Sequence, residues 1–304
     1  MWIKNLQQFL LSSKWTLSAS ELEKKLGEMP CRPCGPQELR TEGFGEPLKG
    51  FNRLVYSAEG LLLITWQEQA RLLPGGVVNE MLAEKVDEVE ARENRKLARR
   101  EKTELKEQII FEALPRAFTR TRRINIVIDS KAGRVLVDSS SAKQAEQVTE
   151  LLRKALGSLP ISRPLTKMPL PGVMTEWLQQ PKTVPAGFGI GDRCELRDSN
   201  SDGPVVRGTG LNLFGDEVKA HLEVGMLLSK VNLSWRDQLE FDLVDDLSIK
   251  RIRPLEQMQE KMDEQDAEDA ESALLADLTL QGQNLRNLLN ELDEVLAVEE
   301  AVPA

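Results

Sequence analysis

Two hairpin patterns constrain the fold of this chain more than any other feature. The first is RLVYS, a turn at residues 58–60 and then LLLITWQ; the second is INIVID and RVLVDSS on either side of SKAG. Each pattern predicts two strands joined by a tight turn, and Gly133 in the second turn suits a residue with positive φ. Strands joined in this way are antiparallel, because parallel strands need a long crossover connection.

Helical patterns alternate with these hairpins. Ser18 or Ser20 is the expected N-cap of a short helix, and Ser141 is the expected N-cap of AKQAEQVTELLRKAL, which Gly157 and Pro160 end. A further helix is expected at residues 216–224, followed by strands in LLSKVNLSW, QLEFDLV and SIKRIRP. Because the spacing does not suit βαβ units, the sequence predicts an α+β fold of antiparallel sheets and flanking helices.

The longest predicted helix runs from about Val78 to Leu114. Pro74-Gly75-Gly76 precedes it, Pro115 ends it, and no residue between them breaks a helix on propensity alone. We therefore expect one long, continuous helix here.

Two Gly- and Pro-rich stretches separate the regular segments. Residues 29–50 and 161–203 are expected to be mostly irregular, with one possible helical turn at TEWLQQ. They suggest a division into 1–76, an N-terminal α+β unit, and 77–160, the long helix with a hairpin and helix. Residues 161–254 would form a loop region with a C-terminal α+β unit, and 255–304 an acidic tail.

Charge is distributed very unevenly along the chain. The formal net charge is −9, yet residues 91–123 carry 11 Lys/Arg against 5 Asp/Glu, and residues 255–304 carry 2 against 14. Because the local field decides whether a polyanion is attracted, an acidic protein with one basic element can still bind nucleic acid. The acidic run 263–271 is expected to be solvated or disordered, and the leucines after it form an amphipathic helix more typical of core packing.

Basic side chains recur every three or four residues along the long helix, which predicts one basic face about 20 Å long. A second group lies in and after PRAFTRTRR. Backbone phosphates are the expected targets, without base-specific contacts. The candidate DNA-binding residues are Arg92, Arg95, Lys96, Arg99, Arg100, Lys102, Lys106, Arg116, Arg120, Arg122 and Arg123.

The same helix has two other interpretations. It could be a solvated helix with Glu–Lys pairs, or a coiled-coil-like arm for a protein partner. A continuous 3.5-residue seam needs more apolar residues than Val86, Val89, Leu97 and Leu105, which disfavours the arm.

The candidates for chemistry are weaker. Cys31 and Cys34 form a CxxC that could be a redox pair or half of a zinc site, which only Cys194 and His221 could complete. Gly35 and Pro36 follow in a loop, where a redox motif would have a helix N-terminus, so unpaired cysteines are expected instead. Three glycines in GFGIGD lack the spacing of a phosphate loop and predict an ordinary loop, and His221 has no neighbouring nucleophile. We expect that the protein is not an enzyme and that it binds no metal and no cofactor.

The ends of the chain and its hydropathy suggest a cytoplasmic protein. No apolar run approaches the roughly 18–20 residues of a membrane-spanning helix. The N-terminal MWIKNLQQFLLSSKW carries polar residues throughout its short apolar stretch and lacks a cleavage site typical of signal peptides.

Several segments, in order along nearly the whole chain, resemble the bacterial RdgC family. They are WIKNL (2–6), the PCG turn with Cys34, LPRAFTR (114–120), residues 127–160, TEWL (175–178) and residues 229–253. The central block, VIDSKAGRVLVDSSSAKQAEQVTELLRKALGSLP, is the most specific of them.

The resemblance implies a non-enzymatic, nucleoid-associated protein that binds duplex DNA with little sequence preference. It implies a ring-shaped homodimer around DNA that restrains RecA-type recombination and takes part in replication-fork repair. On the same resemblance, Phe118 would be an apolar plug in the dimer interface and Arg116 its polar neighbour; from the residues alone, Phe118 could equally anchor the helix end in the core. One departure is that Gly208, Thr209 and Gly210 leave Arg207 nearly alone, where the family leads us to expect further basic residues.

Overall fold

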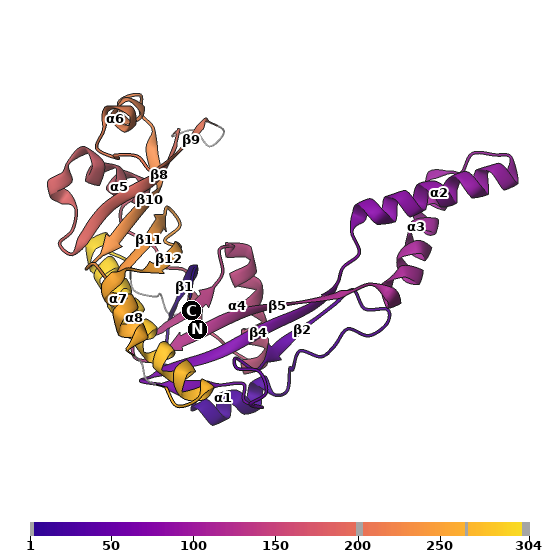
Figure 1. The fold of residues 1–304 in the computed structure, drawn as a ribbon, viewed down its shortest axis with the longest axis horizontal. Coiled ribbons are helices and arrows are strands. Elements are labelled where there is room, and N and C mark those ends of the chain that lie inside the picture. Colours follow the sequence, from indigo (N-terminus) through magenta and orange to yellow (C-terminus); the bar gives the residue numbers. More distant parts are fainter. Residues whose placement is uncertain (1–2, 199–202, 265–266, 300–304) are drawn as a thin grey trace. The chain divides into compact units, whose positions relative to one another are not determined.

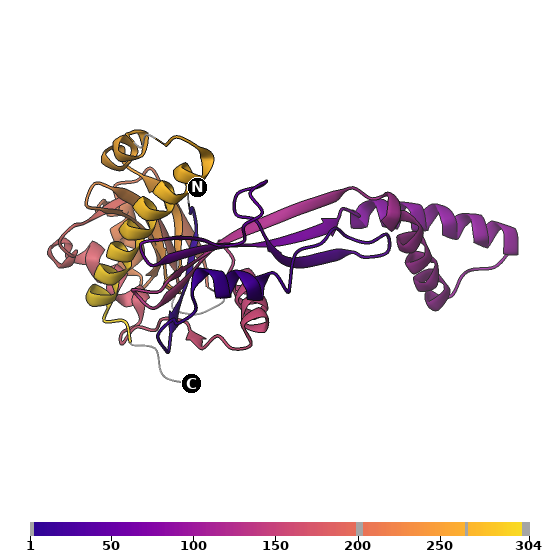
Figure 2. The ribbon, with the colours of Figure 1, turned by 90° about the horizontal axis from the view of Figure 1, so that it is seen from below.

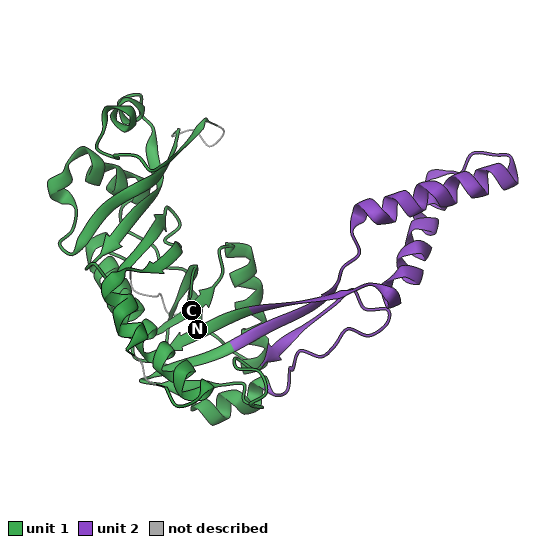
Figure 3. Cartoon of the chain, in the orientation of Figure 1, with its two compact units in different colours: residues 1–26, 46–64, 124–304 green, residues 27–45, 65–123 purple. Residues whose placement is uncertain are grey.

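The structure is a computed structural model, which describes residues 3–198, 203–264 and 267–299. The chain divides into two compact units (Figure 3). Unit 1 comprises residues 1–26, 46–64 and 124–304, and unit 2 comprises residues 27–45 and 65–123. Unit 2 carries nearly balanced charge, with 15 Lys/Arg against 14 Asp/Glu, so the acidic excess of the chain belongs to unit 1.

Unit 1 combines antiparallel strands with helices, which confirms the predicted α+β class (Figure 1). Its helical segments are α1 (Ala19–Leu26), α4 (Ala142–Leu156), α5 (Leu170–Gln179), η2 (Pro181–Thr183), α6 (Asp216–Glu223), α7 (Glu256–Asp263) and α8 (Ala270–Leu296). Its strands are β1 (Leu6–Leu11), β3 (Tyr56–Ala58), β6 (Arg134–Asp138), β7 (Ile161–Ser162), β8 (Phe188–Arg197), β9 (Val205–Thr209), β10 (Leu227–Trp235), β11 (Leu239–Val244) and β12 (Ile249–Pro254). Two more strands, β4 (Leu61–Arg71) and β5 (Thr119–Asp129), continue into unit 2.

The strands pair in the order β4-β5-β6-β1-β12-β11-β10-β8-β9, with β3 on β4 and β7 on β1. The central strand β1 joins residues far apart in the sequence, because Leu6 pairs with Asp138 of β6 and with Ile249 of β12. The side chains of Leu6, Ile249 and Val231 are almost fully buried. One apolar core therefore runs through unit 1 and is built from both ends of its sequence.

The predicted hairpins and caps of unit 1 are confirmed. In the first hairpin Tyr56 pairs with Leu63, and in the second Asp129 pairs with Arg134 across a turn in which Gly133 has φ 65°. The Ser141 side chain accepts a hydrogen bond from the Gln144 backbone N–H at the start of α4, and Gly157 ends that helix in the left-handed conformation. Local turn and cap chemistry thus decided these elements.

Helix α8 lies across the sheet of unit 1 and contributes to its core, as both views of the ribbon show (Figures 1 and 2). Leu285, Leu288 and Leu289 are fully buried. Gly282 is required at a close approach, because a Cβ there would lie 2.2 Å from a Leu61 methyl carbon. The expectation that this helix packs into the core is confirmed, so residues 270–296 of the predicted acidic tail belong to the core of unit 1.

The acids of α8 also face partners in unit 1. Arg286 pairs with the buried Asp129 at 2.7 Å, Asp293 accepts from the buried Arg134, and Glu291 accepts from the Trp235 indole N–H at 2.8 Å. Within the predicted acidic run 263–271, residues 265–266 lie outside the described residues, as do Trp2 and residues 300–304.

Two predicted loops contain strands. GFGIGD begins β8, and β2 (Arg40–Gly45) lies within the stretch expected to be irregular. The glycines of GFGIGD serve packing, since a Cβ on Gly191 would lie 1.8 Å from Asn232 Oδ1 and one on Gly189 would lie 2.6 Å from Ser234 Oγ. Tight approach of neighbouring strands, which composition does not report, explains why the loop prediction was wrong.

Unit 2 contains β2, the ends of β4 and β5, and two helices in place of the single predicted one. These are α2 (Gly75–Glu93) and α3 (Arg99–Ala113), followed by the short 3₁₀ helix η1 (Leu114–Arg116). The two helices pack against each other, and we name residues 75–113 the helical hairpin and residues 92–103 the hairpin tip. The prediction of one continuous helix is therefore wrong.

No helix in the described part of the chain is both long enough and apolar enough to cross a membrane.

Candidate nucleic-acid interface

The helical hairpin reverses direction at Asn94, which adopts the left-handed conformation with φ 49° and ends α2. Glu90 stabilises the reversal, because its carboxylate accepts the Leu97 backbone N–H at 2.9 Å. Lys96 donates to the same carboxylate at 2.5 Å and Lys102 pairs with it at 3.2 Å. These contacts join α2, the turn and α3, and they explain the break that helix propensity could not predict.

A second glutamate organises the start of α3. Glu101 accepts the Ala98 backbone N–H at 2.8 Å and a two-pronged hydrogen bond from Arg95 at 2.6 and 2.9 Å. A carboxylate in the first turn also interacts favourably with the helix dipole. The Ala98 side chain cannot cap the helix, so the Glu101 carboxylate provides the hydrogen-bond acceptor for a backbone N–H at this end.

The hydrogen bonds at the hairpin tip hold both glutamates ionised. Those from Lys96 and from the Leu97 backbone lower the pKa of Glu90 to about 2. Those from Arg95 and from the Ala98 backbone lower the pKa of Glu101 to about 2. The two carboxylates therefore remain negative at every physiological pH, and part of the tip's positive charge is used to fix its own shape.

The cations predicted for one helix face are instead distributed over two helices and the turn between them. Six Lys/Arg face two Asp/Glu in the hairpin tip, so it keeps a local net charge of +4. Lys96 and Arg100 are each 89% exposed although they pair with Glu90 and Glu104. Arg99 has no ion pair among the described residues, and Lys106 donates to Asn79 at 3.0 Å. The prediction of a single basic face on one helix is therefore wrong, but the cations are concentrated at the hairpin tip.

The remaining predicted cations lie at the other end of the hairpin. Arg116 ends η1, and Arg120 and Arg122 are exposed on alternate positions of β5, so they share one strand face. Arg123 is half-buried and has interactions of its own. All eleven candidate DNA-binding residues therefore belong to unit 2.

Phe118 is the most exposed large apolar side chain in the described part of the chain, at 84%. It does not anchor the helix end in the core, which excludes the simpler of the two sequence-based interpretations. Its backbone is nevertheless fixed, because the Phe118 carbonyl accepts the Leu72 N–H at 2.7 Å. An ordered backbone that presents a bare aromatic ring is typical of an interaction site.

Arg71 orders the segment before Phe118. Its guanidinium donates to the carbonyl oxygens of Leu114 at 2.8 Å and Ala117 at 3.2 Å. The same group donates to the carbonyls of Gly35 at 3.1 Å and Cys34 at 3.4 Å. Sequence reasoning missed Arg71, since its partners are backbone oxygens that leave no pattern in the side chains.

A second basic group lies in unit 1, where the sequence suggested that Arg207 stands alone. Glu195 of β8, which is buried, pairs with Arg207 and Arg197 at 2.8 Å each and with Lys230 at 3.6 Å. Burial alone would raise the pKa of Glu195, but these cations lower it to about 2. Three cations thus surround one carboxylate on neighbouring strands. The available signal in the sequence was the placement of opposite charges at positions that pair across these strands.

The cysteines and the histidine are divided between the units. Cys31 and Cys34 are free thiols in unit 2, and Cys194 and His221 lie in β8 and α6 of unit 1. The Cys34 thiol donates to the Gln69 carbonyl at 2.9 Å, and burial raises the pKa of the Cys31 thiol. A raised thiol pKa disfavours the reactive thiolate. In residues 3–198, 203–264 and 267–299, no group of three or more His, Cys, Asp or Glu side chains is placed to hold a metal.

Comparison with known proteins covers nearly the whole chain. The profile of the RdgC family, described as "Putative exonuclease, RdgC", matches residues 1–299. Curated relatives carry the name recombination-associated protein RdgC, and no enzymatic activity is stated in that name. Those of Pseudomonas aeruginosa (strain LESB58) and Shewanella loihica are each 41% identical, over 99% and 97% of this chain and 98% of each relative. That of Yersinia pestis (strain Pestoides F) is 35% identical over 98% of this chain and 99% of the relative. The family profile and the curated relatives agree, and the chain belongs to the RdgC family.

Proposed function

We propose that this protein binds duplex DNA without sequence preference, as a ring-like homodimer that restrains RecA-type recombination. A role in recombination is supported by the family, because its curated members are named recombination-associated proteins. The exposed cations of unit 2 support DNA as the ligand. Participation in replication-fork repair and association with the nucleoid belong to the same proposal.

The observation that carries the proposal is the +4 charge gathered in the hairpin tip, within an otherwise acidic chain. Most of these cations already pair with glutamates, and the exposed pairs among them, such as that of Arg100 with Glu104, contribute only about 0–1 kcal/mol each. Phosphates can replace such partners, and the release of condensed counterions favours the exchange. The backbone is the target, because no base-reading motif accompanies the cations.

The dimer rests on a different observation. Phe118 is 84% exposed on an ordered segment, and Arg116 is an exposed neighbour two residues away. Burying an aromatic ring of this kind is among the larger single contributions to an interface. A ring needs two contacts between its subunits, and we assign one of them to Phe118 and Arg116.

The cations around Glu195 are a second candidate site for phosphate, within unit 1. Arg197 and Arg207 remain 53% and 68% exposed at their side chains while they pair with the carboxylate. They keep donors available for phosphate, and Arg presents these donors in a fork that matches phosphate oxygens.

The description of the family as an exonuclease gives a second candidate function. A linear duplex incubated with the protein and Mg²⁺ or Mn²⁺ distinguishes the two. The DNA-binding proposal expects intact DNA that is retarded in a gel, whereas progressive shortening from the ends would support the exonuclease.

A titration of labelled duplex with the purified protein at rising salt tests the proposal. Affinity should fall linearly on a plot of log K against log salt, with a slope of about −0.9 for each phosphate contacted. Binding that is absent at low salt, or that does not change with salt, would contradict it. Homopolymeric and mixed-sequence duplexes of equal length should bind equally well.

A further inference from the structure

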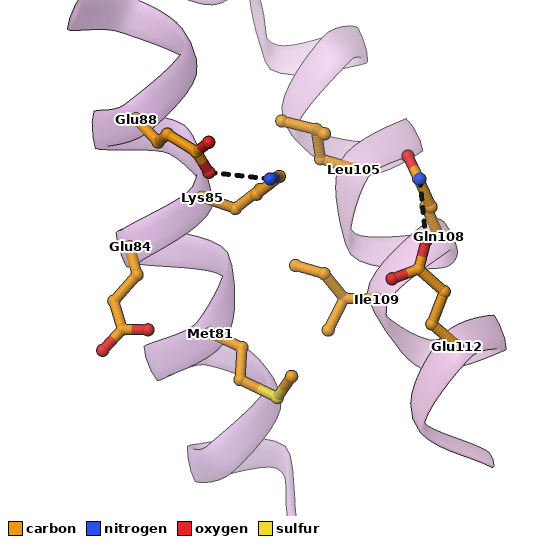
Figure 4. A pocket seen from close by; sticks show the side chains of 8 residues that line it. All are labelled: Met81, Glu84, Lys85, Glu88, Leu105, Gln108, Ile109 and Glu112. Atoms are coloured by element: carbon orange, nitrogen blue, oxygen red, sulfur yellow. Dashed lines mark hydrogen bonds and ion pairs between the residues drawn. The ribbon is translucent and has the colours of Figure 1, made fainter. Parts of the chain in front are cut away.

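An open groove of about 330 Å³ separates the two helices at the base of the helical hairpin (Figure 4). Met81 of α2 and Leu105 and Ile109 of α3 point into it, as Figure 4 shows. Met81 is 41% exposed and Leu105 is half-buried, whereas Ile109 is buried. The volume lies at the lower end of the range of ligand pockets, roughly 300–1,000 Å³.

Exposed apolar surface continues beyond the groove. Val77, one turn before Met81 on the same face of α2, is 47% exposed. Large apolar side chains that gather on one element and have polar neighbours typically mark a protein-binding surface. Methionine suits such a surface, because its unbranched side chain adapts to differently shaped partners.

The margins of the groove are acidic. Glu84, Glu88 and Glu112 line it with a single cation, Lys85, which pairs with Glu88 at 2.7 Å. The helical segments on either side, residues 75–91 and 104–113, together carry eight Asp/Glu against two Lys. The base of the helical hairpin is thus opposite in charge to its tip, so it repels polyanions and attracts cationic partners.

We propose that this groove binds a basic amphipathic helix of a partner protein. From Met81 to Glu88 the groove extends along eight residues of α2, which are about 10 Å from first to last at 1.5 Å per residue. That length fits two turns of a helix whose apolar side chains at i, i+3 or i+4 and i+7 contact Met81 and Leu105. Lysines or arginines beside those positions reach Glu84 and Glu112. The tip and the base of one hairpin then serve two ligands of opposite charge.

The test uses the full chain and a fluorescein-labelled 14-residue peptide, with leucine at i, i+3, i+4 and i+7 and lysine elsewhere. A second peptide has glutamate in place of every lysine. Fluorescence anisotropy should show binding of the lysine peptide and at least tenfold weaker binding of the glutamate peptide. Equal binding of the two peptides would overturn the proposal, because the acidic margin would then contribute nothing.

Matched variants locate the binding. Glu84→Lys with Glu112→Lys should weaken binding of the lysine peptide at least tenfold, whereas Glu217→Lys with Glu223→Lys on α6 makes the same change of net charge and should leave it within twofold. Met81→Ser should weaken binding about threefold or more, and Met168→Ser, at a methionine that is 62% exposed, should not. Equal losses in the groove and control variants would overturn the proposal. Circular dichroism confirms that each variant keeps its helices.

A photo-cross-linking peptide gives an independent readout. Benzoyl-phenylalanine in place of one leucine reacts preferentially with methionine side chains close to it. Mass spectrometry should find the cross-link at Met81 or elsewhere within residues 77–112. A cross-link mainly outside these residues would place the peptide on another surface and overturn the assignment.

Discussion

The guanidinium of Arg71 donates to the carbonyl oxygen of Leu114 at 2.8 Å and so joins the end of β4 to the segment that presents Phe118. The same guanidinium reaches the carbonyls of Cys34 and Gly35, so two segments 80 residues apart depend on one side chain. Hydrogen bonds from a charged donor contribute about 1.5–3 kcal/mol each when the acceptor would otherwise be unsatisfied.

Replacing Arg71 should loosen this segment. Arg71→Ala leaves several carbonyls without a donor, and Arg71→Lys cannot reach both groups at once, because an ammonium lacks the planar fork. We expect a loss of about 1–3 kcal/mol in the free energy of unfolding for Arg71→Ala. Tryptic cleavage at Arg116 should also accelerate, and cleavage at the wild-type rate would contradict the role assigned to Arg71.

Phe118→Ser should shift the proposed dimer towards the monomer without lowering the melting temperature of the subunit. The ring is 84% exposed, so its removal costs the isolated subunit no packing. Sedimentation velocity at several protein concentrations measures the change. Val224→Ser, at a valine that is 77% exposed in unit 1, is the matched control and should leave the dimer intact. A Phe118→Ser protein that dimerises as tightly as the wild type would contradict the interface.

The helical hairpin should lose stability at acid pH. The pKa values of Glu90 and Glu101 are about 2 in the folded hairpin, below the value of about 4.3 of an unfolded chain. Their contribution is therefore complete above about pH 4.3 and is lost as the pH falls towards 2. Amide hydrogen exchange within residues 90–101 should accelerate in this window.

Glu90→Gln supplies the control for that experiment. Its hairpin should be less protected at neutral pH and should show a smaller further change on acidification. Glu80→Gln, on the exposed face of α2, should behave as the wild type does. An acid response that is unchanged in Glu90→Gln would show that other groups cause it.

Gly191→Ala should destabilise unit 1, because the new methyl group would lie 1.8 Å from Asn232 Oδ1. The buried Asn232 side chain, which donates to the Phe241 carbonyl, would have to move. Overpacking of this kind typically costs about 1–3 kcal/mol. Gly172→Ala in α5 is the control, since nothing lies within 4 Å of its Cβ position, and it should be neutral or stabilising. Urea unfolding measures both variants, and equal midpoints would contradict the packing role of Gly191.

Local signals predicted much of the fold. The turn at Gly133, the Ser141 cap and the leucines of α8 each specify a nearby structure, and each is confirmed. The break at Asn94 escaped prediction because it depends on Glu90 accepting a hydrogen bond from Leu97, seven residues away. Arg71 and the group around Glu195 escaped for the same reason: their partners are distant in sequence or belong to the backbone. The cations of the tip were found from composition, but their arrangement needed the structure.

The thiol interpretation is tested by replacing Cys31 and Cys34 with Ser. Burial raises the pKa of the Cys31 thiol, which disfavours its thiolate, and the Cys34 thiol donates to the Gln69 carbonyl. Duplex affinity should therefore change less than twofold and should not respond to reductant. The thiol–disulfide interpretation would be supported if the double variant lost duplex binding and if reductant caused the same loss in the wild type.

The central claim is that the hairpin tip contacts DNA phosphates, and duplex binding by Arg99→Glu with Arg100→Glu tests it most directly. Both positions lie in the first turn of α3, where acidic residues favour the helix dipole, so the hairpin should stay folded. Lys143→Glu with Lys154→Glu, on α4 of unit 1, makes the same change of net charge and serves as the control. We predict at least a tenfold loss of affinity and a shallower salt dependence for the tip variant, with little change for the control. Equal affinities and slopes for the tip variant and the wild type would contradict the claim.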